Sequence, residues 1–101
     1  MNVLSFYASE KQHHAGMPLH QCFLEQAKSL GIPGGSAFRA IAGFGRHGRM
    51  HEETFFELAG ELAVKVEFIL DEQLAEQLLD RLRAQQLNVF YVRFPVQTGT
   101  V

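Results

Sequence analysis

The order of its strand-like and helix-like segments constrains the fold of this 101-residue chain more than any other feature. Four segments are short, rich in apolar or small residues and bounded by polar or turn-forming residues, as strands are: 2–8, 36–45, 63–70 and 88–94. Two longer segments repeat apolar residues every three or four positions, as amphipathic helices do: 18–30 and 72–86. The chain is therefore predicted to run strand, helix, strand, strand, helix, strand.

This order is that of an α+β fold, the ferredoxin-like βαββαβ sandwich, in which a four-stranded antiparallel sheet carries two helices on one face. A chain of this length has the size of one domain, so residues 1–101 are predicted to form a single ferredoxin-like domain. The strands hold more aromatic residues than two helices can cover, among them Tyr7, Phe38, Phe90 and Phe94. We therefore expect part of the opposite sheet face to be apolar and to meet a partner by oligomerisation.

Local signals predict where the helices begin and end. Pro18 suits the first helical position, because it has no N–H group to leave unsatisfied there. Gly31 suits the end of the first helix, and Asp71 suits the N-cap of the second. Residues 54–62 are expected to form a short helical turn, and residues 9–16 and 45–53 are expected to be loops.

The composition argues against several classes of partner. Nine Lys and Arg against eleven Asp and Glu give a net charge of −2, whereas nucleic-acid-binding domains carry a basic excess, so no nucleic-acid partner is expected. No run of about 18 apolar residues and no basic, apolar leader is present, so no direct membrane insertion is expected. Cys22 is the only cysteine and lies in an apolar stripe, which predicts a buried, reduced thiol and a cytoplasmic location.

A basic segment that contains glycine follows the second strand. Gly43 and Gly45 permit positive φ angles and allow backbone N–H groups to approach a ligand, while Arg39, Arg46 and Arg49 offer fork-shaped donors for phosphate or carboxylate. These residues predict an anion site, and the alternative is a solvated, mobile loop with no ligand. The Gly-x-x-x-x-Gly-Lys-Ser/Thr pattern of a phosphate-binding loop is absent.

A second basic segment precedes the first helix. Lys11, His13 and His14 would strengthen the attraction that backbone donors at a helix N-terminus have for anions. Metal binding by these histidines with His47 and His51 is an alternative, but adjacent histidines rarely reach one ion and no cysteine or clear carboxylate completes a tetrahedral set. We therefore predict no metal site, assign no cofactor, and leave a pH-sensing role or no role for these histidines open.

Catalysis has less support than binding. His51, beside Glu52 and Glu53, is a candidate acid–base group, and Arg39 with Asn88 are the residue types that acyl-phosphate hydrolases of this fold use. The serines lie in no nucleophile elbow, and no paired carboxylates mark an enclosed site. A small enzyme acting on a phosphorylated or acyl substrate remains an alternative, as does a protein-interaction module that needs no ligand.

Three motifs together resemble those of a known family. They are GMPL at 16–19, LGIPG at 30–34, and RAIAGFG at 39–45 leading to Met50-His51. Spread over almost the whole chain, they resemble the PII-like family known as domain of unknown function one-ninety. By this resemblance, one group of residues matches the family motif at the base of the long loop: Gly43, Phe44, Gly45 and His51. Another group matches the family's N-terminal region: Lys11, Gly16, Pro18 and Leu19.

The resemblance implies a fold and an assembly. Members of this family have a ferredoxin-like fold and are similar to the trimeric PII nitrogen-signalling proteins. In PII proteins the long loop after the second strand contacts target proteins, and adenine nucleotides bind in clefts between subunits. The chain departs from the family in Ala40, where Gly is typical, and in Ala63, where Pro often follows Leu62. It also has LDEQ at 70–73 in place of the Gly- and Lys-rich phosphate loop of PII proteins.

These observations lead to one hypothesis. The chain is predicted to be a cytoplasmic, PII-like regulatory protein that forms a homotrimer and is not an enzyme. A nucleotide or another anionic metabolite would bind at a subunit cleft, and residues 45–53 would signal to a partner protein. The residues expected at the ligand are Lys11, His13, Gly16, Arg39, Gly43, Phe44, Gly45, Arg46, Arg49 and His51.

Overall fold

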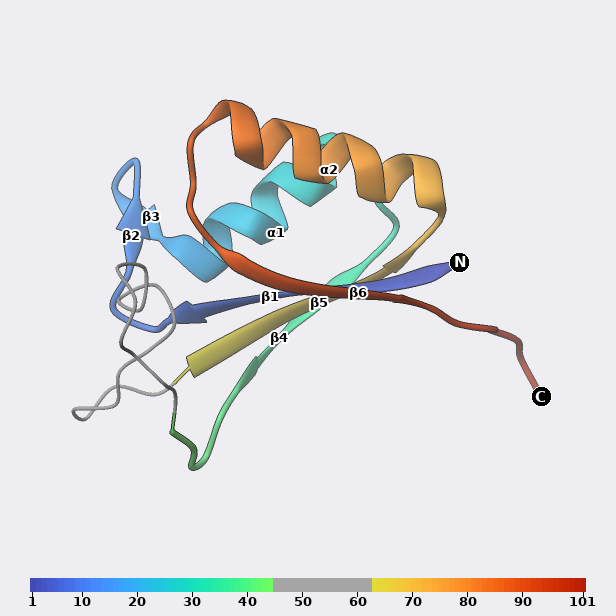
Figure 1. The fold of residues 1–101 in the computed structure, drawn as a ribbon, viewed down its shortest axis with the longest axis horizontal. Helices are drawn as coiled ribbons and strands as arrows, with labels where there is room; N and C mark the ends of the chain where they lie inside the picture. Colours follow the sequence, from blue (N-terminus) through green and yellow to red (C-terminus); the bar gives the residue numbers. More distant parts are fainter. Residues whose placement is uncertain (45–62) are drawn as a thin grey trace.

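The computed structural model describes residues 1–44 and 63–101, and the helical turn predicted at 54–62 lies outside them. Along the chain the elements are β1 (Asn2–Ser9), β2 (His13–His14), β3 (Met17–Pro18), α1 (Leu19–Ser29), β4 (Gly35–Arg39), β5 (Ala63–Leu70), α2 (Glu72–Ala84) and β6 (Phe90–Pro95). Four strands form an antiparallel sheet in the order β4-β5-β1-β6, and both helices cover one of its faces (Figure 1). The predicted ferredoxin-like α+β fold is confirmed.

The hydrophobic core lies between the sheet and the two helices. Its largest side chains are almost completely buried: Leu4, Phe6, Phe23, Val66, Phe68, Leu70 and Leu78. Phe6 lies among them, with its ring centroid 5.0 Å from that of Phe23 on α1 and 6.3 Å from that of Phe68 on β5. Burying such a side chain contributes about 1.5–3 kcal/mol, so this cluster holds α1 against the central strands.

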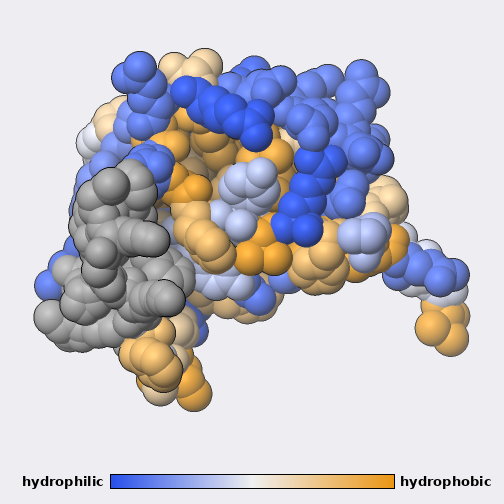
Figure 2. Space-filling view, viewed as in Figure 1, coloured by the Kyte–Doolittle hydropathy of each residue, from blue (hydrophilic) through white to orange (hydrophobic). Residues whose placement is uncertain are grey.

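The other face of the sheet carries no helix. Four large apolar side chains lie on it, each 46–49% exposed: Phe38, Ile69, Phe90 and Phe94. Tyr7 lies there too, and its ring centroid is 5.7 Å from that of Phe90 on the adjacent strand. Figure 2 shows apolar surface along β6 and polar surface over α2. The expectation that this open face is apolar is confirmed, while its covering by a partner stays a prediction.

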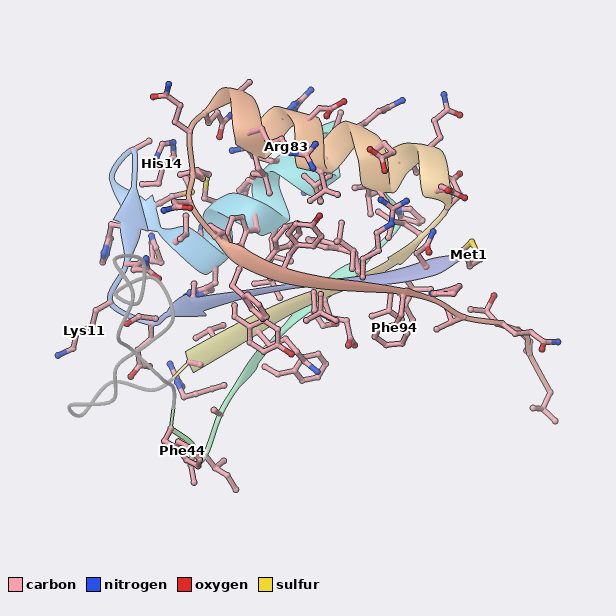
Figure 3. The ribbon with its side chains drawn as sticks, viewed as in Figure 1. Met1, Lys11, His14, Phe44, Arg83 and Phe94 are labelled. Atoms are coloured by element: carbon pink, nitrogen blue, oxygen red, sulfur yellow. The ribbon has the colours of Figure 1, made fainter. Side chains whose placement is uncertain are left out.

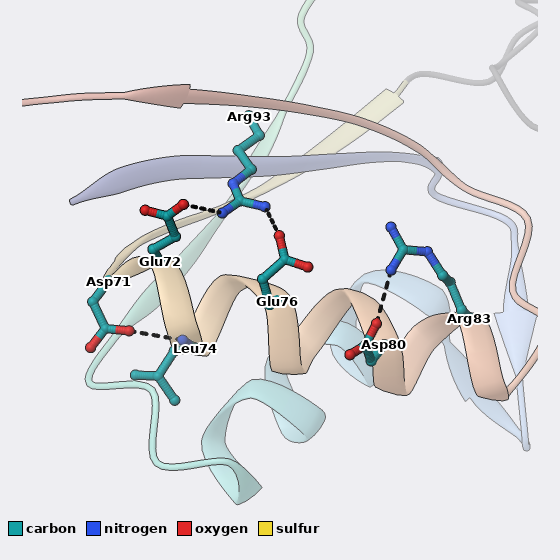
Figure 4. A network of polar contacts seen from close by, with 7 residues as sticks. All are labelled: Asp71, Glu72, Leu74, Glu76, Asp80, Arg83 and Arg93. Atoms are coloured by element: carbon teal, nitrogen blue, oxygen red, sulfur yellow. Dashed lines mark hydrogen bonds and ion pairs between the residues drawn. The ribbon is translucent and has the colours of Figure 1, made fainter.

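The helix ends follow the local signals closely. Pro18 is the N-cap residue and not the first helical residue, because its ψ of 139° is still extended. Gly31 follows α1 with a φ of +84°, a conformation that glycine adopts without strain. The carboxylate of Asp71 accepts a 2.8 Å hydrogen bond from the backbone N–H of Leu74, which confirms the predicted N-cap of α2 (Figure 4). Helix α2 ends at Ala84, two residues before the expected end.

Two strand predictions and one loop prediction need correction. Within the described part of the segment predicted as a strand over 36–45, β4 runs from Gly35 to Arg39. The last contact with β5 is the 2.9 Å hydrogen bond from Ala40 N–H to the Ala63 carbonyl, and residue 45 lies outside the described residues. The predicted loop 9–16 contains β2, which pairs with β3 in a small hairpin. The last strand, predicted over 88–94, runs from Phe90 to Pro95.

An arginine fastens the edge strand β6 to α2. The Arg93 guanidinium donates a 2.5 Å hydrogen bond to the Glu76 carboxylate, and a second carboxylate, Glu72, lies 3.9 Å away (Figure 4). This hydrogen bond lowers the pKa of Glu76 and raises the pKa of Arg93. Neither helix in the described parts of the chain is long and apolar enough to cross a membrane.

We expect Gly35→Ala to destabilise the fold. A Cβ atom at Gly35 would overlap the ring of Phe68, which is fully packed in the core, so the ring or the strand must shift. Such overpacking costs about 1–3 kcal/mol, measurable as a loss in the free energy of unfolding in urea. Gly34→Ala is the control, because a Cβ at that position meets no atom within 4 Å. Equal stability of the two variants would contradict this packing.

The Arg93–Glu76 contact predicts a pH dependence of stability. Because the pKa of Glu76 is lowered in the folded protein, its contribution is complete above the usual value of 4.5 and is lost as the pH falls through the lower folded value. Glu76→Gln should therefore lower the urea midpoint at neutral pH, and the difference from the unsubstituted protein should vanish in acid. Glu25→Gln removes an exposed carboxylate with no ion-pair partner in residues 1–44 and 63–101, and should show no such pH-dependent difference.

Candidate functional site

Three chain segments meet at one end of the sheet because of the strand directions. β1 and β4 are both antiparallel to β5, which lies between them, so they run parallel to each other. Their C-terminal ends therefore lie at the same end of the sheet, where β5 begins. The turn after β1, the β2–β3 hairpin and the residues that follow β4 lie at this end (Figure 1), while the loop predicted at 45–53 lies outside the described residues.

The turn after β1 is held by its own hydrogen bonds. The backbone N–H of Gln12 donates to the carbonyl of Ser9 at 3.1 Å, which closes a four-residue turn over 9–12. The side-chain oxygen of Gln12 accepts from Ser9 N–H at 2.7 Å, and the Ser9 hydroxyl accepts from Lys11 N–H at 3.1 Å. These bonds fix the backbone of the two central residues of the turn, Glu10 and Lys11.

The hairpin that follows explains Gly16 without a ligand. Ala15 and Gly16, the two residues between β2 and β3, have φ angles of +53° and +82°. Positive φ at both central positions is the requirement of the type I′ hairpin turn, and Gly meets it with no steric cost. Ala15 is an unusual residue at positive φ, so the sequence carried no clear signal for this hairpin.

The histidines of this hairpin do not converge on one point. His13 and His14 are neighbours on a strand, so their side chains leave on opposite faces. A ring nitrogen of His13, Nδ1, lies 2.9 Å from the carbonyl of Lys11. In the residues that the structure describes, no three His, Cys, Asp or Glu side chains are grouped to hold a metal ion.

Three arginines are predicted to bind the ligand, and the structure describes one of them, Arg39, the last residue of β4. Its backbone is fixed by pairing opposite Val64, and its side chain is 65% exposed. The Arg39 Nε atom donates a 2.8 Å hydrogen bond to the carboxylate of Glu10, whose side chain is 28% exposed. The contact joins the end of β4 to the turn after β1, in which Lys11 is the next residue after Glu10.

The chain after Arg39 carries exposed apolar side chains. Ile41 is 96% exposed and Phe44 is 88% exposed, and Gly43 lies between them with no atom within 4 Å of its Cβ position. Figure 3 shows Phe44 and Lys11 at the same end of the molecule, away from Met1. The other predicted ligands lie outside the described residues: Gly45, Arg46, Arg49 and His51.

Sequence reasoning missed Glu10. No pattern links Glu10 to Arg39, because the two residues are 29 positions apart and meet only through the pairing of three strands.

Cys22 is buried as expected, and its Sγ atom accepts a 3.3 Å hydrogen bond from Gln26 Nε2 on the next turn of α1. The Leu70-Asp71-Glu72 connection leads directly from β5 into α2, as its sequence indicates.

Comparisons with known proteins agree with this architecture. The sequence model of the DUF190 family, described as Uncharacterized ACR, COG1993, matches residues 1–97. A UPF0166 protein of Aquifex aeolicus (strain VF5) is 32% identical over 83 residues, which are 82% of this chain and 79% of that protein. A candidate PII-like signalling protein from Thermus thermophilus, known from its crystal structure, superposes with a TM-score of 0.57 at 20% identity, covering 92% of this chain and 81% of that one.

We expect Gly16→Ala to lower stability by about 1–2 kcal/mol, because an L side chain is strained at a φ of +82°. A Cβ atom added at Gly16 would meet no other atom within 4 Å, so the loss of stability comes from backbone strain and not from a clash. The measurement is the free energy of unfolding in urea. An unchanged stability combined with weakened ligand binding would instead assign Gly16 to a binding site.

Proposed function

The chain belongs to the DUF190 family, and on that premise we propose that it is a PII-like regulatory protein that senses a small anion. The ligand is a nucleotide or another phosphorylated metabolite, bound at a cleft between subunits. Its binding would bias the contact that residues 45–53 make with a partner protein, which is how a ligand shifts the population of one state over another.

One observation supports this proposal: Arg39 Nε donates to Glu10, the neighbour of Lys11 in the turn after β1, at 2.8 Å. Arg39 and Lys11 are both exposed, and Arg39 keeps its two terminal nitrogens free of the Glu10 hydrogen bond, which uses Nε. A guanidinium with free N–H groups suits phosphate or carboxylate. The remaining ligands proposed for the site are His13, Gly16, Gly43, Phe44, Gly45, Arg46, Arg49 and His51.

A homotrimer is the assembly that we propose, and the open sheet face supports it. Two charged side chains of β5 lie on this face, Lys65 and Glu67. They pair with each other, since Lys65 Nζ lies 3.4 Å from the Glu67 carboxylate. Lys65 also stands over the ring of Phe38, at 5.3 Å from its centroid. The face therefore offers mainly apolar surface with little unpaired charge, which favours burial against copies of itself.

We propose no catalytic role for this chain. In the described residues the carboxylate that contacts Arg39 is that of Glu10, and it is engaged in an ion pair with the guanidinium. Loss of turnover in His51→Ala with retained ligand binding would instead identify an enzyme.

A single design tests assembly and ligand together. Native mass spectrometry of protein purified without added ligand should give a trimer, and thermal-shift screening should find stabilisation by nucleotides or phosphorylated metabolites. Phe94→Glu places a charge in the open sheet face and should give monomers. Arg39→Gln should reduce the thermal shift while leaving the trimer intact.

The controls separate the alternatives. Gln97→Glu adds the same charge at an exposed position beyond β6 and should leave the trimer unchanged. A monomer in the unsubstituted protein would overturn the shared cleft. A trimer that no anion stabilises would favour a protein-interaction module that works without a ligand.

A further inference from the structure

We propose that Glu10 is a built-in competitor for the anion at Arg39, so that Glu10 sets the affinity of the site. This inference rests on the proposed function, because it concerns the same guanidinium. In the free chain the Glu10 carboxylate takes the Nε donor of Arg39 at 2.8 Å. An anion that binds only the terminal nitrogens must share the guanidinium charge with this carboxylate, and one that also needs the Nε edge must displace it.

Glu10 is held ready for this contact. It lies at the second position of the 9–12 turn, which three hydrogen bonds among Ser9, Lys11 and Gln12 close. The backbone of Arg39 is fixed as well, by its ladder position opposite Val64 and by the following bond from Ala40 N–H to Ala63 O. With both backbones fixed, the carboxylate stays at a high effective concentration beside the guanidinium, and a free ligand must compete with it.

The local charge leads to the same conclusion. Lys11 and Arg39 supply two positive charges at this end of the sheet, and Glu10 cancels one of them. Replacing Glu10 by Gln removes the competing charge while keeping a side chain of the same size. Because the Arg39 side chain is 65% exposed and that of Glu10 is 28% exposed, solvent weakens the pair, so the effect is moderate and shrinks as salt is added.

The test measures binding of inorganic pyrophosphate by isothermal titration calorimetry at low salt. Glu10→Gln should bind roughly two- to fivefold more tightly than the unsubstituted protein, the range that corresponds to an exposed ion pair. When Arg39→Gln is already present, adding Glu10→Gln should not increase the affinity for pyrophosphate, because the guanidinium for which Glu10 competes is absent.

Asp80→Asn is the matched control. It removes one carboxylate from an exposed arginine pair of the same kind, Asp80–Arg83 at 2.9 Å on α2, and so changes the net charge equally (Figure 4). If Asp80→Asn increased the affinity for pyrophosphate as much as Glu10→Gln does, the inference would be overturned, since the change in net charge alone would then explain the tighter binding. Thermal unfolding of each variant verifies that it is folded.

Two further outcomes separate this inference from the proposed function. Weaker or unchanged binding in Glu10→Gln, with Arg39 still required, would overturn the competition and assign Glu10 to positioning Arg39. Absence of pyrophosphate binding in the unsubstituted protein and in Glu10→Gln alike would overturn the anion site itself, and the inference with it.

Discussion

The pairing of β5 with a strand on each side is the constraint on which the rest of the molecule depends. All eight residues of β1 pair with β5 on one edge, and Gly35–Arg39 pair with it on the other. Because both neighbours are antiparallel to β5, they end at the same end of the sheet. The Glu10–Arg39 contact follows from this geometry, since it joins the residue after β1 to the last residue of β4.

The same strands give the sheet two unequal faces. Residues of β5 alternate between the core, where Val66 and Phe68 are buried, and the open face, where Ile69 is exposed. On the edge, β4 approaches β5 with a glycine opposite Phe68, so the aromatic ring fills the space that a side chain at Gly35 would need. A small domain that keeps so many aromatic side chains on its open face leaves apolar surface unburied, and this is the physical basis for the proposed self-association.

The sequence predicted the fold better than the site because the two depend on different interactions. Element order, the N-cap at Asp71 and the stop at Gly31 follow from patterns within a few residues, and each was confirmed. The end of β4 at Arg39 depends on its pairing with β5, and the β2–β3 hairpin depends on backbone angles at Ala15 and Gly16. The partner of Arg39 is set by strand pairing over a separation of 29 residues, for which one sequence contains no signal.

The exposure of this cluster has a consequence for how any anion can be held there. The side chain of Arg39 is 65% exposed, so each charge interaction is weakened by water and contributes little alone. One chain, with one carboxylate already bound to its arginine, therefore offers a weak site. Tight binding requires further donors, and in the proposed function these are supplied by residues of the 45–53 loop or by a neighbouring subunit. The proposed assembly and the proposed ligand site thus depend on each other: the cleft that the trimer would create is what would make the exposed cations useful.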